Sequence, residues 1–217
     1  MRFIHNLKIL FIVLVTVLIL SQVGCYPGES LTVQQLDMVI TTYDKEADFT
    51  SYKTYALSDS VIHYNGNTGE VVPPGEDDGI SREFDQLILD LIEENMNNRG
   101  YVLSNDPDLS KIDLALTASV VATQNSGYYF VPWWPWGGWG YWYPPTLVPV
   151  SFNFASGTIF INMWDAINRN ETEETLPLRW DAALNGLLQS NSGATSQRIT
   201  TAIDQAFNQS EYLQAGN

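Results

Sequence analysis

Apolar and polar residues alternate with a period of two along several stretches of this chain. Between Leu114 and Val120, for instance, every second residue is apolar, and Thr117 and Ser119 occupy polar positions between them. This period is typical of a half-buried β-strand. Stretches rich in Val, Ile, Thr and Tyr favour strands as well. We therefore expect strands at residues 36–43, 53–57, 101–103, 113–121, 158–166 and 178–184.

Two other stretches repeat apolar residues every three or four positions, which is the period of a helix with one buried face. The first lies around residues 84–92, where Asp78 or Ser81 could cap its start and Gly100 could end it. The second covers residues 199–207. Strands in runs with two helices predict an α+β fold: a mixed, largely antiparallel sheet with two helices packed on one face and a long aromatic loop.

The segment 59–79 separates the second strand from the first helix. It holds six glycines and prolines, so we expect a long loop there, in which the turn signal Asn65-Gly66 could form a small hairpin. His63 lies in this segment, and we expect a solvated side chain. Glu76, Asp77 and Asp78 could offer oxygen ligands to Ca²⁺, but they lack the ligand spacing of a calcium loop, and a solvated acidic loop is the simpler interpretation.

Residues 1–24 have the composition of an export signal. Arg2 and Lys8 precede an apolar run at 9–20, which is too short to cross a bilayer but fits the hydrophobic part of a secretory signal. The run ends before Cys25, and a small residue next to a lone cysteine resembles the signal of bacterial lipoproteins. That resemblance implies acylation of Cys25, by palmitate for example, and anchoring in a lipid bilayer. An ordinary secretory signal that leaves a free thiol, or an uncleaved anchor, is the alternative.

This interpretation divides the chain into a signal peptide at 1–24, a polar tether at 25–35, a single domain at 36–211 with an aromatic insert at 126–150, and a tail at 212–217. It places the protein in the bacterial cell envelope. The residue after the cysteine is Tyr26 and not the Asp that is linked to inner-membrane retention in enteric bacteria, which favours the outer membrane.

The composition limits the partners and the kinds of functional site that the chain could have. The chain of 217 residues has 25 acidic and 10 basic residues and a net charge of −15, which argues against nucleic acid and anionic headgroups as electrostatic partners. Cys25 is the only cysteine, and His63 is the only histidine outside the signal. Neither a metal-ligand cluster nor a phosphate-binding loop is recognisable, so we expect no metal, no cofactor and no enzymatic activity.

Carboxylate pairs are the remaining candidates for chemistry, because glycoside hydrolysis needs only two acids. Asp44 and Asp48 could face each other near a strand end. The simpler interpretation is a polar turn in which Asp48 binds a nearby backbone N–H. The alternative to a non-enzymatic protein is therefore a hydrolase or glycan-binding module, with acids such as Asp44, Asp48 or Asp165 beside the aromatic loop.

Residues 128–145 contain ten aromatic side chains and no charge. Four prolines and three glycines oppose regular pairing, so we expect an irregular loop. Its rings could pack on the open sheet face, insert at a membrane–water interface, or bind a glycan, peptide or envelope protein. The residues expected to contact a membrane or partner are Trp133, Trp134, Trp136, Trp139, Tyr141, Trp142 and Tyr143. Trp164 and Trp180 lie on predicted strands, and we expect them to pack in the sheet.

Several short motifs follow one another in an order that resembles a known family. They are Asp44-x-x-x-Asp48-Phe49-x-x-Tyr52-Lys53-Thr54-Tyr55, Gly100-Tyr101, Asp113-Leu114, Gly157-Thr158-Ile159-x-Ile161, Asp165-Ala166 and a strand with Trp180. Together they resemble the bacterial lipoproteins of the domain of unknown function 4136, over about residues 37–210. The chain departs from the family where Asp181 follows the late Trp, a position often held by Gly. The resemblance implies an envelope lipoprotein and supplies no catalytic residues.

The sequence therefore predicts a non-enzymatic, lipid-anchored envelope protein that presents its Trp- and Tyr-rich loop to the membrane or a partner.

Overall fold

The computed structural model describes residues 38–65, 71–73, 75–76, 79–106, 111–121, 125–131, 146–154, 157–170, 175–188 and 196–216. Its elements follow the order of strands and helices expected for an α+β fold. They are β1 (Val39–Tyr43), η2 (Phe49–Ser51), β2 (Thr54–Leu57), β3 (Ile62–Tyr64), α2 (Asp85–Asn98), β4 (Val102–Leu103), β5 (Leu114–Val121), β6 (Asn125–Val131), β7 (Thr146–Phe154), β8 (Thr158–Asp165), β9 (Leu178–Leu184) and α3 (Ser196–Asn208).

Seven strands form one mixed sheet in the order β1-β9-β8-β5-β2-β4, with β3 also paired to β5. The long ladders that join β1, β9, β8 and β5 are antiparallel. In contrast, β2 and β3 lie parallel to β5, one beside its first half and the other beside its second half. The expected mixed, largely antiparallel sheet is confirmed.

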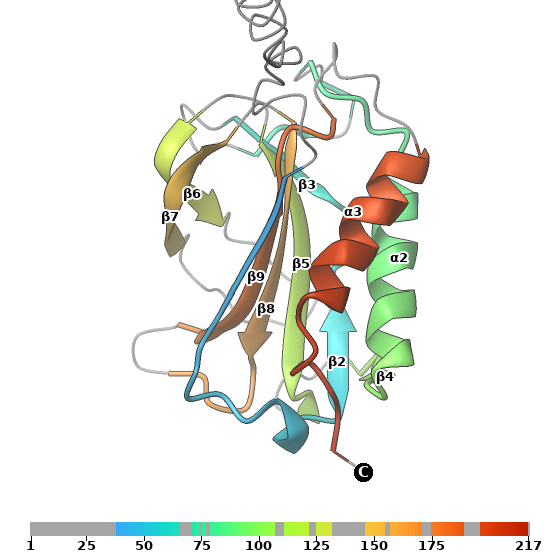
Figure 1. The fold of residues 1–217 in the computed structure, drawn as a ribbon, viewed down its shortest axis with the longest axis vertical. Helices are drawn as coiled ribbons and strands as arrows, with labels where there is room; N and C mark the ends of the chain where they lie inside the picture. The colour runs from blue at the N-terminus through green and yellow to red at the C-terminus, as the bar shows by residue number, and fades with distance from the viewer. Residues whose placement is uncertain are drawn as a thin grey trace, which may run out of the picture. The chain divides into compact units, whose positions relative to one another are not determined.

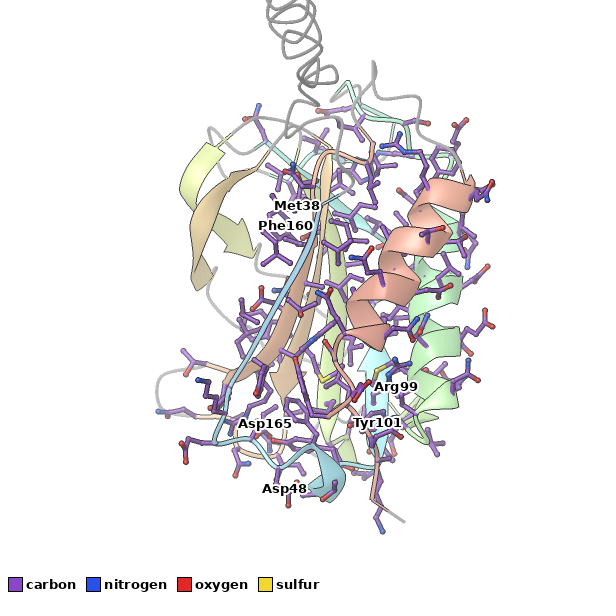
Figure 2. The ribbon with its side chains drawn as sticks, viewed as in Figure 1. Met38, Asp48, Arg99, Tyr101, Phe160 and Asp165 are labelled. Atoms are coloured by element: carbon purple, nitrogen blue, oxygen red, sulfur yellow. The ribbon has the colours of Figure 1, made fainter. Side chains whose placement is uncertain are left out.

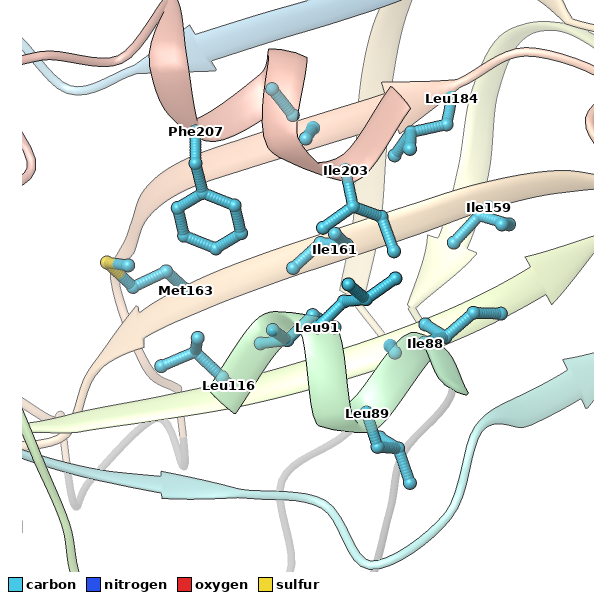
Figure 3. Packing of buried hydrophobic residues seen from close by; sticks show 14 of the residues in the cluster. Ile88, Leu89, Leu91, Leu116, Ile159, Ile161, Met163, Leu184, Ile203 and Phe207 are labelled. Carbon is cyan, nitrogen blue, oxygen red and sulfur yellow. The ribbon is translucent and has the colours of Figure 1, made fainter. Parts of the chain in front are cut away.

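Both helices cover one face of this sheet (Figure 1). The apolar side chains of α2 and α3 point toward alternate residues of the central strands (Figure 3). Ile88 of α2, Ile203 and Phe207 of α3 and Trp180 of β9 are fully buried in this core. Within the described part of the chain, no helix is long and apolar enough to cross a membrane.

The central strands depart from the expected half-buried pattern. Every residue of β5 and β8 is buried, so both faces of these strands are covered. The polar positions of β5 hold only the short side chains of Thr117 and Ser119, which fit into a covered face more readily than long charged ones. The alternation thus marks the helix-facing side of each strand correctly, but it does not mark an exposed side.

Three local expectations were wrong. The segment expected as a loop contains β3, and α2 begins at Asp85 after an N-cap residue, Phe84, that makes no side-chain cap. Ser81 instead accepts a hydrogen bond from the backbone N–H of Glu83, while Asp78 lies outside the described residues. Finally, β6 extends into the stretch 128–145 expected to be irregular, and its residues 128–131 pair with β7, which begins directly after that stretch. Pro149 is tolerated there because each strand of a two-stranded sheet has one free edge.

Candidate functional site

Residues of the ordered motifs gather at one end of the main sheet. Asp165 lies at the end of β8, Asp44 directly follows β1, and Tyr52 follows η2. Figure 2 shows Asp48, Tyr101 and Asp165 toward this end, while Met38 and Phe160 lie toward the other. Arg179 of β9 reaches the same place and joins two of the candidate acids.

Arg179 binds both Asp44 and Asp165. Its Nε and Nη2 atoms donate to Asp165 Oδ2 at 3.0 and 2.8 Å, and its Nη1 atom donates to Asp44 Oδ2. Asp165 is fully buried and also accepts hydrogen bonds from the Tyr52 hydroxyl at 2.7 Å and from the backbone and side-chain nitrogens of Asn168 at 2.9 and 2.8 Å. This arrangement satisfies a buried carboxylate with a fully paired network, as burial of a charge requires.

The network keeps both acids ionised. Burial raises the pKa of Asp165, but hydrogen bonds from Asn168, Tyr52 and Arg179 outweigh it, and the net effect is a lowered pKa. The pKa of Asp44 is also lowered, first by the Glu46 backbone N–H and then by Arg179. Burial and the neighbouring Asp165 raise the pKa of Tyr52 to about 12. A general acid must hold a proton near the working pH, so this geometry suits a structural link better than proton transfer.

Asp48 takes no part in this network. Its side chain caps η2 by accepting from the Thr50 backbone N–H at 3.1 Å and from the Thr50 hydroxyl at 2.6 Å. The prediction of a polar turn that uses the Asp48 side chain is confirmed. A catalytic pair of Asp44 and Asp48 is not supported, because each acid has its own partners.

Asp113 is a structural residue that the sequence did not single out as a site. Its Oδ2 atom accepts from the backbone N–H groups of Lys53 and Thr54 at 2.7 and 2.9 Å, and the Thr54 hydroxyl accepts from the Asp113 N–H. This reciprocal pair fixes the register of β2 beside the start of β5. The sequence signal that could have identified Asp113 was its place in the ordered motifs. Because Asp113 joins two strands, this motif marks a contact that stabilises the fold.

His63 is buried, contrary to expectation. Its exposed fraction is 1%, and its Nε2 atom lies 3.0 Å from Asp85 Oδ1 at the start of α2. The solvated side chain was expected because residues 59–79 look like a loop, whereas β3 places His63 beside β5 and under α2. Among the described residues, no three His, Cys, Asp or Glu side chains are placed to hold a metal ion.

A row of polar side chains crosses the sheet on the face opposite the helices. Thr42, Asp181, Asn162 and Thr117 occupy paired positions on β1, β9, β8 and β5. Asp181 is buried and accepts a hydrogen bond from the Thr42 hydroxyl. Burial raises the pKa of Asp181, and the bond from Thr42 only partly offsets that effect. The alternation in the sequence predicts that these residues lie on the face opposite the apolar residues, but it does not predict that they are buried.

An open groove of about 410 Å³ lies on the outer side of α2, and it is lined by Asp90, Glu93, Glu94, Asn97 and Asn98. These side chains are polar or acidic, and the groove lacks the apolar lining of a typical small-molecule site. It gives no geometric support for a hydrolytic cleft.

The structure does not describe the residues predicted for lipidation and for membrane or partner contact. Cys25 and Trp133, Trp134, Trp136, Trp139, Tyr141, Trp142 and Tyr143 lie outside the described residues. The strand tryptophans are described: Trp180 is fully buried and donates to Ser210 Oγ at 2.9 Å, and Trp164 is 6% exposed. The prediction that these two pack in the sheet is confirmed.

Comparison with known proteins supports the resemblance. The family model described as Domain of unknown function (DUF4136) matches residues 39–210. A crystal structure of a DUF4136 family protein from Bacteroides thetaiotaomicron VPI-5482 is similar, with a TM-score of 0.57 and 23% identity over 82% of this chain and 97% of that chain. At this identity the similarity shows the fold alone.

Two weaker structural similarities are to PelC dodecamers from Paraburkholderia phytofirmans. One has a TM-score of 0.38 and 13% identity over 82% of this chain and 99% of that chain; the other, a PelC variant, has a TM-score of 0.39 and 14% identity over 82% and 98%. No curated protein matches the chain.

Proposed function

The chain belongs to the family described as Domain of unknown function (DUF4136), and from that premise we propose that it is a non-enzymatic, lipid-anchored protein of the bacterial cell envelope. Its role is to present the Trp- and Tyr-rich loop to the membrane or to a partner there. The observation that carries the proposal is the apolar run of residues 9–20 that ends just before the only cysteine, Cys25.

The loop supports the second half of the proposal. Residues 128–145 carry no charge in a chain of net charge −15, and their Trp and Tyr side chains favour the headgroup region of a bilayer. An anchor at Cys25 would hold the domain close to that region, where neutral rings can insert while the acidic surface stays in water.

The hydrolase alternative gains no support from the candidate acids. Asp44 and Asp165 are both bound to Arg179, and Asp48 caps η2. All three acids thus have a structural role that accounts for their positions. A glycan-binding role for the aromatic loop remains the outcome to test beside membrane binding.

Lipidation is tested in cells fed a labelled palmitate analogue. The native chain is expected to take up the label and to sediment with the outer-membrane fraction, whereas the Cys25→Ser variant should take up none and leave the membrane fraction. Equal labelling of both chains would contradict the assignment of Cys25.

Membrane contact is tested separately with residues 26–217, which carry no lipid. We expect this chain to float with neutral phosphatidylcholine liposomes, and to lose flotation when Trp133, Trp134, Trp136 and Trp139 are changed to Ala. A control variant changes four exposed α2 residues, Gln86, Asp90, Glu94 and Asn98, to Ala and should float as before. If no chain floats with the liposomes and the native chain binds a glycan array, the ligand of the aromatic loop is a glycan and not the membrane.

A further inference from the structure

The strand β1 forms one edge of the main sheet. Within the described part of the chain, β9 is the strand that pairs with it, and no strand lies on its other side. Backbone bonds from Asn185 to Met38 and from Asp44 to Arg179 fix which groups of β1 face β9. By the alternation of an antiparallel ladder, Val39, Thr41 and Tyr43 direct their N–H and C=O groups outward.

The described residues of β1 lack the sequence features that normally protect an edge strand. Its five residues, Val-Ile-Thr-Thr-Tyr, include no charge, proline or glycine, and all favour strands. Thr42 and Tyr43 are exposed, and Tyr43 is 45% exposed although its ring stacks on Tyr212. The opposite edge of the sheet is β4, which has only two residues and is protected by its shortness.

The side of α3 that lies beside β1 is also uncharged. The Gln209 side chain, just after α3, donates to the Thr41 hydroxyl at 3.0 Å, so this end of α3 lies next to β1. Gln205 and Thr201 lie about one and two helical turns before Gln209 on the same side of the helix, and all three are exposed. The outer side of α2, in contrast, carries Asp90, Glu93 and Glu94.

The backbone pattern of β1 is self-complementary. When two copies pair antiparallel about Thr41, Thr41 faces Thr41 of the other copy, and each Val39 faces a Tyr43. All outward N–H and C=O groups then find partners, and an aromatic residue packs against a β-branched one, which is a favourable cross-strand pair. A twofold axis through the pair gives the isologous contact typical of homodimers.

We propose that the outer edge of β1, together with the uncharged stripe of Thr201, Gln205 and Gln209, is the surface through which two copies of this chain associate. The expected contact is antiparallel pairing of β1 with β1 of the second copy, which would extend the sheet across both molecules. Charge argues for this occupant: two copies that each carry a net charge of −15 can approach closely only where charged side chains are absent.

The test is sedimentation equilibrium of the full chain in density-matched non-ionic detergent. We expect a dimer whose affinity rises when NaCl is increased from about 0.05 to 0.5 M, because salt screens the repulsion between acidic copies. Thr41→Lys should weaken association about tenfold or more, since it places like charges opposite each other at the twofold axis. Val102→Lys is the matched control, because Val102 is 61% exposed on the other edge, and it should leave the dimer unchanged.

Two further measurements separate loss of pairing from loss of folding. Thr41→Pro removes an outward N–H but no bond to β9, so it should give a monomer whose circular dichroism spectrum matches that of the native chain. In the native chain, the amides of Val39, Thr41 and Tyr43 should exchange more slowly as protein concentration rises. A native monomer at every salt concentration up to about 100 μM protein, a dimer that persists in both Thr41 variants, or concentration-independent exchange would each overturn the proposal.

Discussion

Arg179 shows how a single side chain can organise one end of this protein. It joins Asp165, fourteen positions earlier, to Asp44, which precedes it by 135 positions. Asp165 is fully buried, while the Asp44 side chain is 29% exposed, so the two ion pairs differ in the cost of losing their partner. Removal of one member of a buried pair leaves an uncompensated charge, and that is more damaging than loss of an exposed pair.

We expect Arg179→Met to lower the free energy of unfolding by about 3–5 kcal/mol at pH 7, measured by urea denaturation followed by circular dichroism. The control is Lys111→Met. Its pair with Asp106 is largely exposed and should cost about 1 kcal/mol or less. Because the pKa values of Asp44 and Asp165 are lowered in the folded protein, the native stabilisation is present at neutral pH and lost as pH falls through these values. The deficit of Arg179→Met should therefore shrink in acid, and a constant deficit would contradict this account.

Asp181 should behave in the opposite way. Burial raises its pKa, so ionisation of this carboxylate opposes folding at neutral pH. Asp181→Asn keeps an acceptor for the Thr42 hydroxyl and removes the charge, and it should raise the urea midpoint at pH 7. This increase in the urea midpoint should be absent below the ordinary pKa of Asp. It should develop as the pH rises from there through the raised pKa of Asp181. A lower midpoint at pH 7 would show that the carboxylate itself stabilises the sheet.

The two ends of α2 are determined differently: one by a residue in the local sequence, the other by a contact with a distant strand. The end of α2 is local: Gly100 has a φ of +84°, in the left-handed region that favours glycine. The start of α2 has no side-chain cap, and Asp85 instead lies 3.0 Å from buried His63 on β3. The first feature is visible in the sequence, whereas the second depends on a strand that pairs with β5.

Gly100→Ala is expected to destabilise the protein by about 1 kcal/mol, measured as the shift of the urea midpoint. The added Cβ would lie 3.6 Å from the Ala215 Cβ, an ordinary contact, so the cost comes from backbone conformation and not from a clash. Gly100→Asn should cost less, because Asn tolerates the left-handed region better than Ala. Equal losses for Ala and Asn would indicate that another effect dominates.

At the scale of the whole molecule, charge is distributed unevenly. The outer side of α2 gathers acids, whereas the aromatic segment 128–145 and the β1 edge carry none. The net charge of −15 keeps copies apart in general, so association is favoured only at uncharged surfaces. Both proposed contacts, with the membrane or a partner and with a second copy, use such surfaces, and they are tested independently.

The order of short motifs was enough to identify the family, but the roles of its residues were not readable from order alone. Asp44, Asp48 and Asp113 all look like acids near strand ends. The structure assigns the first to an ion pair, the second to a helix cap and the third to strand register. These roles depend on which backbone or cation lies within about 3 Å, a distance that sequence separation does not give.

The sequence by itself determined the strands with alternating patterns, the two helices and the α+β class, because a period of two or of three to four states which side of an element is apolar. Only the tertiary structure decided that β3 pairs parallel to β5, that His63 is buried, and that β5 and β8 are covered on both faces. Periodicity reports the local difference between two faces. Burial and ion pairing depend on segments that are distant in the sequence, such as those of Asp44 and Arg179, 135 positions apart, and these segments meet only when the chain has folded.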